Sequence, residues 1–342
     1  MGRVKLAFQP RLVNSLFGDP CLFVGLRWSG RAVLFDLGRL DRLPAAEVLR
    51  VRHVFVSHTH MDHFIGFDHL LRLFLAREGE IDLYGPAGVI DNVRGKLEGY
   101  TWNLVDGYPF VLTVHEIGER TLRRVRLPAS RAFAAEDLGE APFDGMLLHA
   151  DGISVRAAQL DHRIVSLGYA IEEDTHLNVR TDELERLAIP AGPWLNAVKT
   201  AIRGGESNDF RIEASWRVNE QIQTRLLRLG DLRGALVVAT PGQKLVYVTD
   251  TLFSAENVRR VVELARGADV FYCESLFVDD DRDQALKRYH LTARQAGTLA
   301  RLAGVKRLET FHFSPRYDGD FERLQREAQA TFNGTIALDE PV

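Results

Sequence analysis

Short, continuously apolar segments alternate with amphipathic segments along most of the chain, a pattern typical of α/β proteins. Phe64, Phe67, Leu71 and Phe74 recur at spacings of three and four, which predicts an amphipathic helix. Strands in two clusters with helices outside them predict a two-sheet sandwich flanked by helices. We expect strands at 21–26, 31–35, 51–56, 81–84, 110–117, 123–127, 153–160, 236–238, 244–249 and 270–273, and helices at 64–76, 89–97, 181–187, 255–266 and 292–303.

The stretch 174–234 departs from this alternation. A helical segment at 181–187 is followed by Ile189-Pro190-Ala191-Gly192-Pro193, a second short helical piece and Gly204-Gly205. Two prolines around a glycine end regular structure. We therefore expect an inserted arm at 174–234 on a single domain that spans 1–342.

Composition and charge narrow the class of protein. The 342 residues are 46% hydrophobic and 26% charged, which is typical of a globular protein. The net charge of −4 argues against a protein whose whole surface binds nucleic acid, but it leaves room for a local RNA-binding patch. No segment approaches about 18 consecutive apolar residues, so we expect a soluble cytoplasmic protein without membrane contact. Cys21 and Cys273 form no metal or disulfide motif, and we expect buried thiols.

A histidine cluster directly follows the strand expected at 51–56. The segment Ser57-His58-Thr59-His60-Met61-Asp62-His63 has the pattern HxHxDH. His58 and His60 project to the same side of an extended segment, while Asp62 and His63 lie where the chain turns into a helix. Imidazole and carboxylate suit zinc and related divalent ions. The pattern therefore predicts a metal site, with a surface histidine cluster or an Asp62 helix cap as the alternatives.

The HxHxDH segment resembles the signature of the metallo-β-lactamase superfamily. This resemblance implies a four-layer αββα sandwich, an α/β fold, with one or two divalent metal ions. His162, at a strand end, matches the third histidine of the superfamily, and His312 matches its last. Asp250, in Tyr247-Val248-Thr249-Asp250-Thr251, is similar to the metal-bridging aspartate, although Thr249 stands where the family usually has glycine.

The C-terminal half is similar to one branch of that superfamily, the ribonuclease Z family of tRNA 3′-processing endonucleases. The similar segments are His290-Leu291-Thr292-Ala293-Arg294-Gln295-Ala296 and His312-Phe313-Ser314-Pro315-Arg316-Tyr317, together with Glu274 and the Gly-Pro element at 187–193. The resemblance implies a homodimer in which the arm of one subunit grips precursor tRNA for the active site of the other. The arm would thus be an RNA exosite.

The resemblance also implies roles for individual residues. His58, His60 and His162 would bind one metal ion and Asp62, His63 and His312 the other, with Asp250 bridging two ions expected to be zinc. His290 would donate a proton to the leaving oxygen, Glu274 would hold the His290 ring, and Asp62 is a candidate to accept a proton from the attacking water. Ser314 and Arg316 are candidate phosphate ligands.

Structural alternatives remain open for several of these residues. His162 could be a core histidine, Asp250 a turn residue, His290 a helix cap and Arg316 half of a salt bridge. His53, His69, His115, His149 and His176 match no motif, and we expect them to be structural.

Three functions are compatible with these features. The leading hypothesis is a two-metal endoribonuclease that removes the 3′ trailer of tRNA precursors, leaving a 3′-hydroxyl. The second keeps the site but acts on small phosphodiesters; it is favoured by a nearly neutral arm, with nine Lys/Arg and eight Asp/Glu at 177–233. The third is a metal-stabilised RNA-binding protein without turnover. The densest basic run is Arg120, Arg123, Arg124, Arg126 and Arg131, which we expect to be a solvated strand edge.

Overall fold

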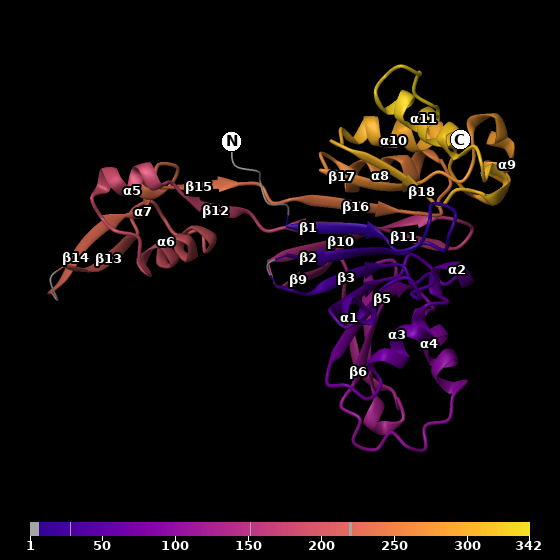
Figure 1. The fold of residues 1–342 in the computed structure, drawn as a ribbon, viewed down its shortest axis with the longest axis horizontal. Helices are drawn as coiled ribbons and strands as arrows, with labels where there is room; N and C mark the ends of the chain where they lie inside the picture. The colour runs from indigo at the N-terminus through magenta and orange to yellow at the C-terminus, as the bar shows by residue number, and fades with distance from the viewer. Residues whose placement is uncertain (1–6, 28, 151, 219–220) are drawn as a thin grey trace. The chain divides into compact units, whose positions relative to one another are not determined.

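The computed structural model describes residues 7–27, 29–150, 152–218 and 221–342. The chain forms two compact units (Figure 1). Unit 1 runs to Glu172 and resumes at Gln243–Val342, and unit 2 is Glu173–Gly242. Within the described residues, no helix is both long and apolar enough to cross a membrane.

Two sheets form the centre of unit 1. The eight-stranded sheet runs β1 to β8 in chain order and is parallel from β3 to β6, because each crossover between these strands carries helix. The six-stranded sheet has the order β18-β17-β16-β11-β10-β9. The strands of the first sheet are β1 (Phe8–Leu12), β2 (Leu22–Leu26), β3 (Ala32–Phe35), β4 (Val51–Phe55), β5 (Glu80–Pro86), β6 (Val111–Ile117), β7 (Thr121–Pro128) and β8 (Glu136–Pro142). Those of the second are β9 (Met146–Ala150), β10 (Ile153–Asp161), β11 (Val165–Glu173), β16 (Lys244–Val248), β17 (Val270–Glu274) and β18 (Leu308–Phe311).

Helices cover the outer face of each sheet, as Figure 1 shows, so the expected four-layer α/β sandwich is confirmed. The first sheet carries α1 (Ala45–Val48), α2 (Met61–Phe64), α3 (Phe67–Phe74) and α4 (Val89–Glu98). The second carries α8 (Ala255–Ala265), α9 (Arg282–Arg288), α10 (Ala293–Ala303) and α11 (Phe321–Phe332). Between the sheets the buried rings of Phe35 and Tyr247 stack at 5.6 Å, and Phe35 also stacks on Phe55 at 5.3 Å. This aromatic packing holds the two sheets together next to the strand ends that are followed by the candidate metal-binding histidines.

The helix expected at 64–76 is observed as α3, but its expected start is wrong, because the chain breaks at Gly66 between α2 and α3. The Gly66 amide donates to the Leu37 carbonyl at 2.7 Å. A Cβ atom at Gly66 would lie 2.1 Å from the Gly38 carbonyl oxygen, so only glycine permits this approach. The break ends α2 before α3 begins, so Asp62 and His63 lie on a separate short helix soon after β4.

Unit 2 has a small core of its own, which includes Trp194, Val198 and Leu229. The Trp194 indole nitrogen donates to the Pro190 carbonyl at 3.1 Å and so anchors the proline-glycine segment. Its elements are β12 (His176–Val179) paired with β15 (Val237–Thr240), the hairpin β13 (Arg211–Val218) and β14 (Gln221–Arg228), and helices α5 (Thr181–Leu187), α6 (Trp194–Arg203) and α7 (Leu229–Leu232).

Candidate metal centre

Seven side chains from four strand ends meet at one edge of the sandwich. His58 and His60 follow β4, and Asp62 and His63 lie on α2. The remaining three follow strands of the second sheet: His162 after β10, Asp250 after β16 and His312 after β18. Both sheets thus contribute to the cluster.

The seven residues form two adjoining groups around Asp250. The ligand atoms of His58, His60, His162 and Asp250 lie within 4.8 Å of one another, and so do those of Asp62, His63 and His312. Asp250 Oδ2 lies 3.7 Å from His58 Nε2, 3.5 Å from His162 Nε2 and 3.5 Å from His63 Nε2. One carboxylate oxygen therefore faces both groups.

The chemistry of the cluster fits divalent cations. His58 Nε2 and His63 Nε2 are buried and have no hydrogen-bond partner within the described structure, although a buried imidazole nitrogen normally has one. Burial lowers the pKa of His58 to about 2, an effect reinforced by the charge of His63. His58 is therefore a neutral imidazole, which is the form that binds a metal ion.

Asp36 orients His63, a role that the sequence did not reveal. His63 Nδ1 donates to Asp36 Oδ2 at 2.9 Å, which leaves Nε2 directed at the cluster. The buried Asp36 carboxylate also accepts from the Ser57 amide at 2.6 Å and from the Tyr247 hydroxyl at 2.8 Å. The only local signal is an acidic residue directly after a buried strand.

Thr249 holds the carboxylate of Asp250. The Thr249 hydroxyl donates to Asp250 Oδ1 at 2.7 Å, and His312 Nδ1 donates to the same oxygen at 2.9 Å. These two bonds orient the carboxylate so that Oδ2 is left for the two groups. Asp250 has a left-handed backbone (φ 43°), and Thr249 is accommodated beside it in place of the glycine expected from the resemblance.

Asn257 joins two of the loops that carry candidate ligands and was also missed from sequence. Its buried amide accepts from the Asp161 backbone N–H at 3.1 Å and donates to the Thr251 hydroxyl at 2.9 Å and the Leu252 carbonyl at 2.9 Å. Asp161 precedes His162 and Thr251 follows Asp250. One side chain on α8 therefore fixes the spacing of these loops.

His290 and Glu274 form an ion pair beside the cluster. His290 Nδ1 lies 2.9 Å from Glu274 Oε2, and Oε1 of the same fully buried carboxylate accepts from the Thr251 amide at 2.8 Å. Burial alone lowers the pKa of His290, but the carboxylates of Glu274 and Asp250 outweigh it, so the net shift is upward. The two carboxylates therefore favour the protonated form of His290 next to the cluster.

Other sequence candidates have structural partners. Arg316 pairs with Asp281 at 3.3 Å and lies over the Phe277 ring at 5.3 Å, while Ser314 precedes a short turn of 3₁₀ helix. Three arginines of the basic run pair with carboxylates of β8: Arg123 and Arg126 of β7 with Asp137 at 2.9 Å and Glu136 at 3.1 Å, and Arg131, in the 3₁₀ turn after β7, with Glu136 at 2.6 Å. These pairs reduce the positive charge available to RNA.

The histidines outside the motifs lie elsewhere. His53 and His115 flank Asp82 on the first sheet, at 3.6 and 2.9 Å. His149 is on β9, and the His176 side chain lies outside the described part of the structure.

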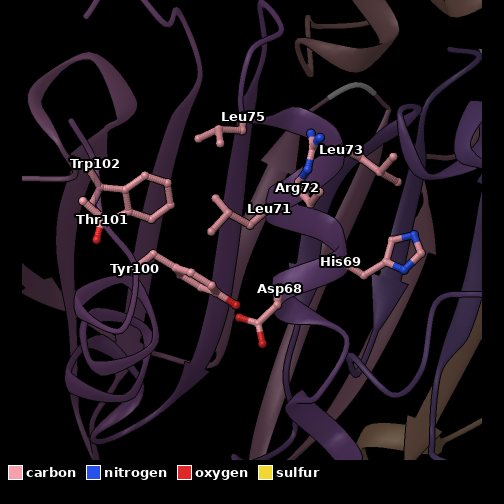
Figure 2. A pocket seen from close by; sticks show the side chains of 9 residues that line it. All are labelled: Asp68, His69, Leu71, Arg72, Leu73, Leu75, Tyr100, Thr101 and Trp102. Atoms are coloured by element: carbon pink, nitrogen blue, oxygen red, sulfur yellow. The ribbon is translucent and has the colours of Figure 1, made fainter. Parts of the chain in front are cut away.

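An apolar groove of about 550 Å³ lies between α3 and residues 100–102 (Figure 2) and is lined by Leu71, Tyr100 and Trp102. His69 also lines this groove, but none of the seven candidate metal ligands does.

Comparisons with known proteins agree over most of the chain. The family model of the Beta-lactamase superfamily domain matches residues 32–177. Ribonuclease Z of Deinococcus radiodurans is 32% identical over 305 residues, covering 88% of each chain, and that of Brevibacillus brevis is 29% identical over 93% of this chain and 88% of its own. Human tRNase Z, short form, superposes with a TM-score of 0.51 at 20% identity over 91% of this chain and 93% of its own. A metallo-beta-lactamase fold protein of Bacillus subtilis reaches 0.54 at 13% identity over 95% of each chain.

Proposed function

The chain belongs to the ribonuclease Z family, and on that basis we propose that it is a cytoplasmic, metal-dependent endoribonuclease that removes the 3′ trailer of tRNA precursors. One observation carries this proposal. The seven candidate ligands and the His290–Glu274 pair, spread from His58 to His312 in sequence, all meet at one edge of unit 1.

We propose two zinc ions as the metals. His58, His60 and His162 would hold one and Asp62, His63 and His312 the other, with Asp250 shared between them. When bound, such a pair lowers the pKa of a water molecule and offsets negative charge on the phosphoryl oxygens.

Protein side chains would donate and accept the protons of the reaction. The water oxygen forms a bond to phosphorus while the bond from phosphorus to the 3′ oxygen of the tRNA breaks. A ribose oxygen is a poor leaving group unless it is protonated, and His290 Nε2 would give it that proton. Glu274 would keep the His290 ring oriented, and Asp62 would take the proton released by the attacking water. The products are a tRNA with a 3′-hydroxyl and a trailer with a 5′-phosphate.

Unit 2 would serve as the RNA exosite. Arg211 and Arg228 stand directly opposite each other on the β13–β14 hairpin, and Arg217 lies on the same face. Ile222 and Leu226 are 69% and 58% exposed on that face. Glu213 lies opposite Leu226, and Arg228 pairs with Asp209 at 2.6 Å, so the face combines apolar side chains with arginines whose charge is partly offset. Such a surface suits a phosphate backbone with adjacent riboses and bases, even though unit 2 as a whole is nearly neutral.

The chain would act as a homodimer. The groove in Figure 2 supplies an apolar surface, since Tyr100 and Trp102 form one wall and Leu71 and Leu75 the other. Exposed apolar side chains that gather in one place can mark a protein interface. Asp68 lies at the polar edge of this groove, and its carboxylate pairs with the Lys96 ammonium group at 2.9 Å.

The test is cleavage of a 3′-labelled tRNA precursor by the purified protein, with the cut mapped to the nucleotide. A single cut next to the discriminator base, lost with chelator and restored by metal, supports the proposal. The near neutrality of unit 2 favours a second candidate, hydrolysis of small phosphodiesters. No cut while bis(p-nitrophenyl) phosphate is hydrolysed would establish that candidate. Binding of the precursor with no hydrolysis of either substrate would instead indicate an RNA-binding protein.

A further inference from the structure

We propose that Arg163 and Tyr289 form a clamp that positions His290 over the metal centre. The guanidinium carbon of Arg163 lies 4.9 Å from the centroid of the Tyr289 ring, a cation–π contact between two loops of unit 1. Arg163 directly follows His162, and Tyr289 directly precedes His290. The clamp thus joins a candidate metal ligand to the candidate proton donor, and its role rests on the proposed function.

A second contact joins the same two loops through the backbone. His162 Nδ1 donates to the Tyr289 carbonyl oxygen at 2.7 Å, so the peptide that leads into His290 is bonded to a ligand ring. The rings of His162 and His290 are 4.9 Å apart at their centroids. Any shift of the Tyr289 peptide would therefore move His290 relative to the centre.

Both residues of the clamp have an uncommon backbone conformation. Arg163 has φ 63° and Tyr289 has φ 61°, in the left-handed region that favours glycine. Tyr289 caps the C-terminus of α9, where glycine or asparagine is the usual residue. A tyrosine there is unfavourable locally, and such strain tends to persist at functional sites. The stacked Arg163 side chain offers a physical reason for the aromatic residue.

Hydrogen bonds hold the backbone next to each residue of the clamp. The Arg163 amide donates to Asp161 Oδ1 at 2.8 Å, and Asp161 is in turn held by Asn257. The His290 amide donates to the Ala285 carbonyl of α9 at 3.0 Å. The Arg163–Tyr289 stack is thus a link between two anchored segments, and its loss would loosen the placement of His290 without removing a ligand.

Loss of the clamp should make the rate of hydrolysis depend more strongly on the leaving group of the substrate. A misplaced proton donor slows departure of a ribose or an unsubstituted phenol, whereas a nitrophenol leaves without assistance. We expect Arg163→Ala and Tyr289→Gly each to lower kcat for the tRNA precursor by about 10- to 100-fold with little change in KM. Hydrolysis of bis(p-nitrophenyl) phosphate and the bound metal should stay near wild type.

The experiment compares Arg163→Ala, Tyr289→Gly and the double variant on the precursor and on aryl phosphodiesters from nitrophenyl to phenyl. Glycine keeps the carbonyl and favours the left-handed backbone, so Tyr289→Gly removes the side chain without straining the backbone. The double variant should be no worse than either single one, and Tyr289→Phe should restore most of the rate. Arg259→Ala, an exposed arginine of α8, controls for loss of a positive charge.

Three results would overturn the clamp. One is a wild-type kcat for Tyr289→Gly, and another is additive losses in the double variant. The third is a raised KM for Arg163→Ala alone, which would make Arg163 a direct RNA contact. If the wild-type protein cuts no precursor, the proposed function fails, but the aryl series still decides the clamp.

Discussion

His63 and Asp36 form a buried imidazole–carboxylate pair, with Nδ1 2.9 Å from Oδ2 and neither side chain accessible to solvent. The pair holds a proton on His63 Nδ1 and directs Nε2 at the candidate metal centre. A carboxylate that accepts a hydrogen bond from a metal-binding imidazole orients the ring and increases its basicity.

Asp36→Asn should therefore weaken metal binding. The amide keeps the size of the side chain but loses the charge that supports His63, so we expect about 10- to 100-fold lower affinity for one of two zinc ions. Competition with a chromogenic chelator measures this change. Asp41→Asn, which alters an exposed carboxylate paired with Arg39, is the matched control. Equal affinities in both variants would contradict the role assigned to Asp36.

Thr249 should matter through its hydroxyl rather than its size. Thr249→Val removes the bond to Asp250 Oδ1 at nearly constant volume, and we expect about tenfold weaker metal binding as the carboxylate loses its orientation. Thr249→Ser keeps the hydroxyl and should stay near wild type. The same chelator competition separates the two variants. A valine variant that binds as tightly as the serine variant would show that the His312 bond alone orients Asp250.

His290→Ala should separate chemistry from metal binding. Cleavage of the tRNA precursor should fall by about 10²- to 10⁴-fold, the usual contribution of a general acid. Metal content by mass spectrometry should not change. Bis(p-nitrophenyl) phosphate should be far less affected, because its leaving group needs no proton. Equal losses on both substrates would mean that His290 serves something other than the leaving group.

Zinc binding should release protons unequally from the two groups. His58 has a pKa of about 2 and is neutral at pH 7. Burial alone lowers the pKa of His312, but Asp250 raises it to about 10, so His312 is charged at pH 7 in the metal-free protein. Zinc must displace that proton, and its affinity for the Asp62–His63–His312 group should rise as pH rises toward 10.

Calorimetric titration of the metal-free protein in two buffers of different ionisation enthalpy counts these protons. Burial alone lowers the pKa of His63, but the carboxylates of Asp250 and Asp36 raise it as well, so the group with both histidines should release more protons than the other. His312→Ala should reduce the difference without abolishing it. Equal release from both equivalents would contradict the unequal protonation.

A charge in the Figure 2 groove should dissociate a dimer formed there. Tyr100→Arg places a cation in the apolar wall, where a buried partner surface cannot solvate it and where the nearby Asp68 carboxylate is already paired with Lys96. Size-exclusion chromatography with light scattering should then report half the wild-type mass. Leu138→Arg, an exposed apolar site on β8, is the matched control. An unchanged mass for Tyr100→Arg would locate any dimer interface elsewhere.

The parts of the fold that could be predicted from sequence are those with a strong local pattern. The strands β4 and β16 were expected within one residue of their observed bounds, because most of their residues are apolar and buried. Strand β8 was missed because its exposed, acidic residues pair with the arginines of β7 at the edge of the sheet. The sequence of β8 alone carries no such signal.

The same limit applies to the site. The seven candidate ligands stand in recognisable segments, whereas Asp36, Asn257 and Tyr289 act through partners more than fifteen residues away in the chain. No local pattern marks an asparagine that bridges two loops. Its role emerges only when α8 packs against the six-stranded sheet.

The origin of the candidate ligands in both sheets has a consequence for how the protein acquires its metal. A zinc finger captures its ion from a short segment and folds around it. Here the pairing of β16, β17 and β18 must bring Asp250 and His312 beside His58, so the complete pocket exists only after the slow, non-local contacts have formed. Metal binding should therefore follow refolding of the chain rather than nucleate folding, and its onset should mark the end of refolding.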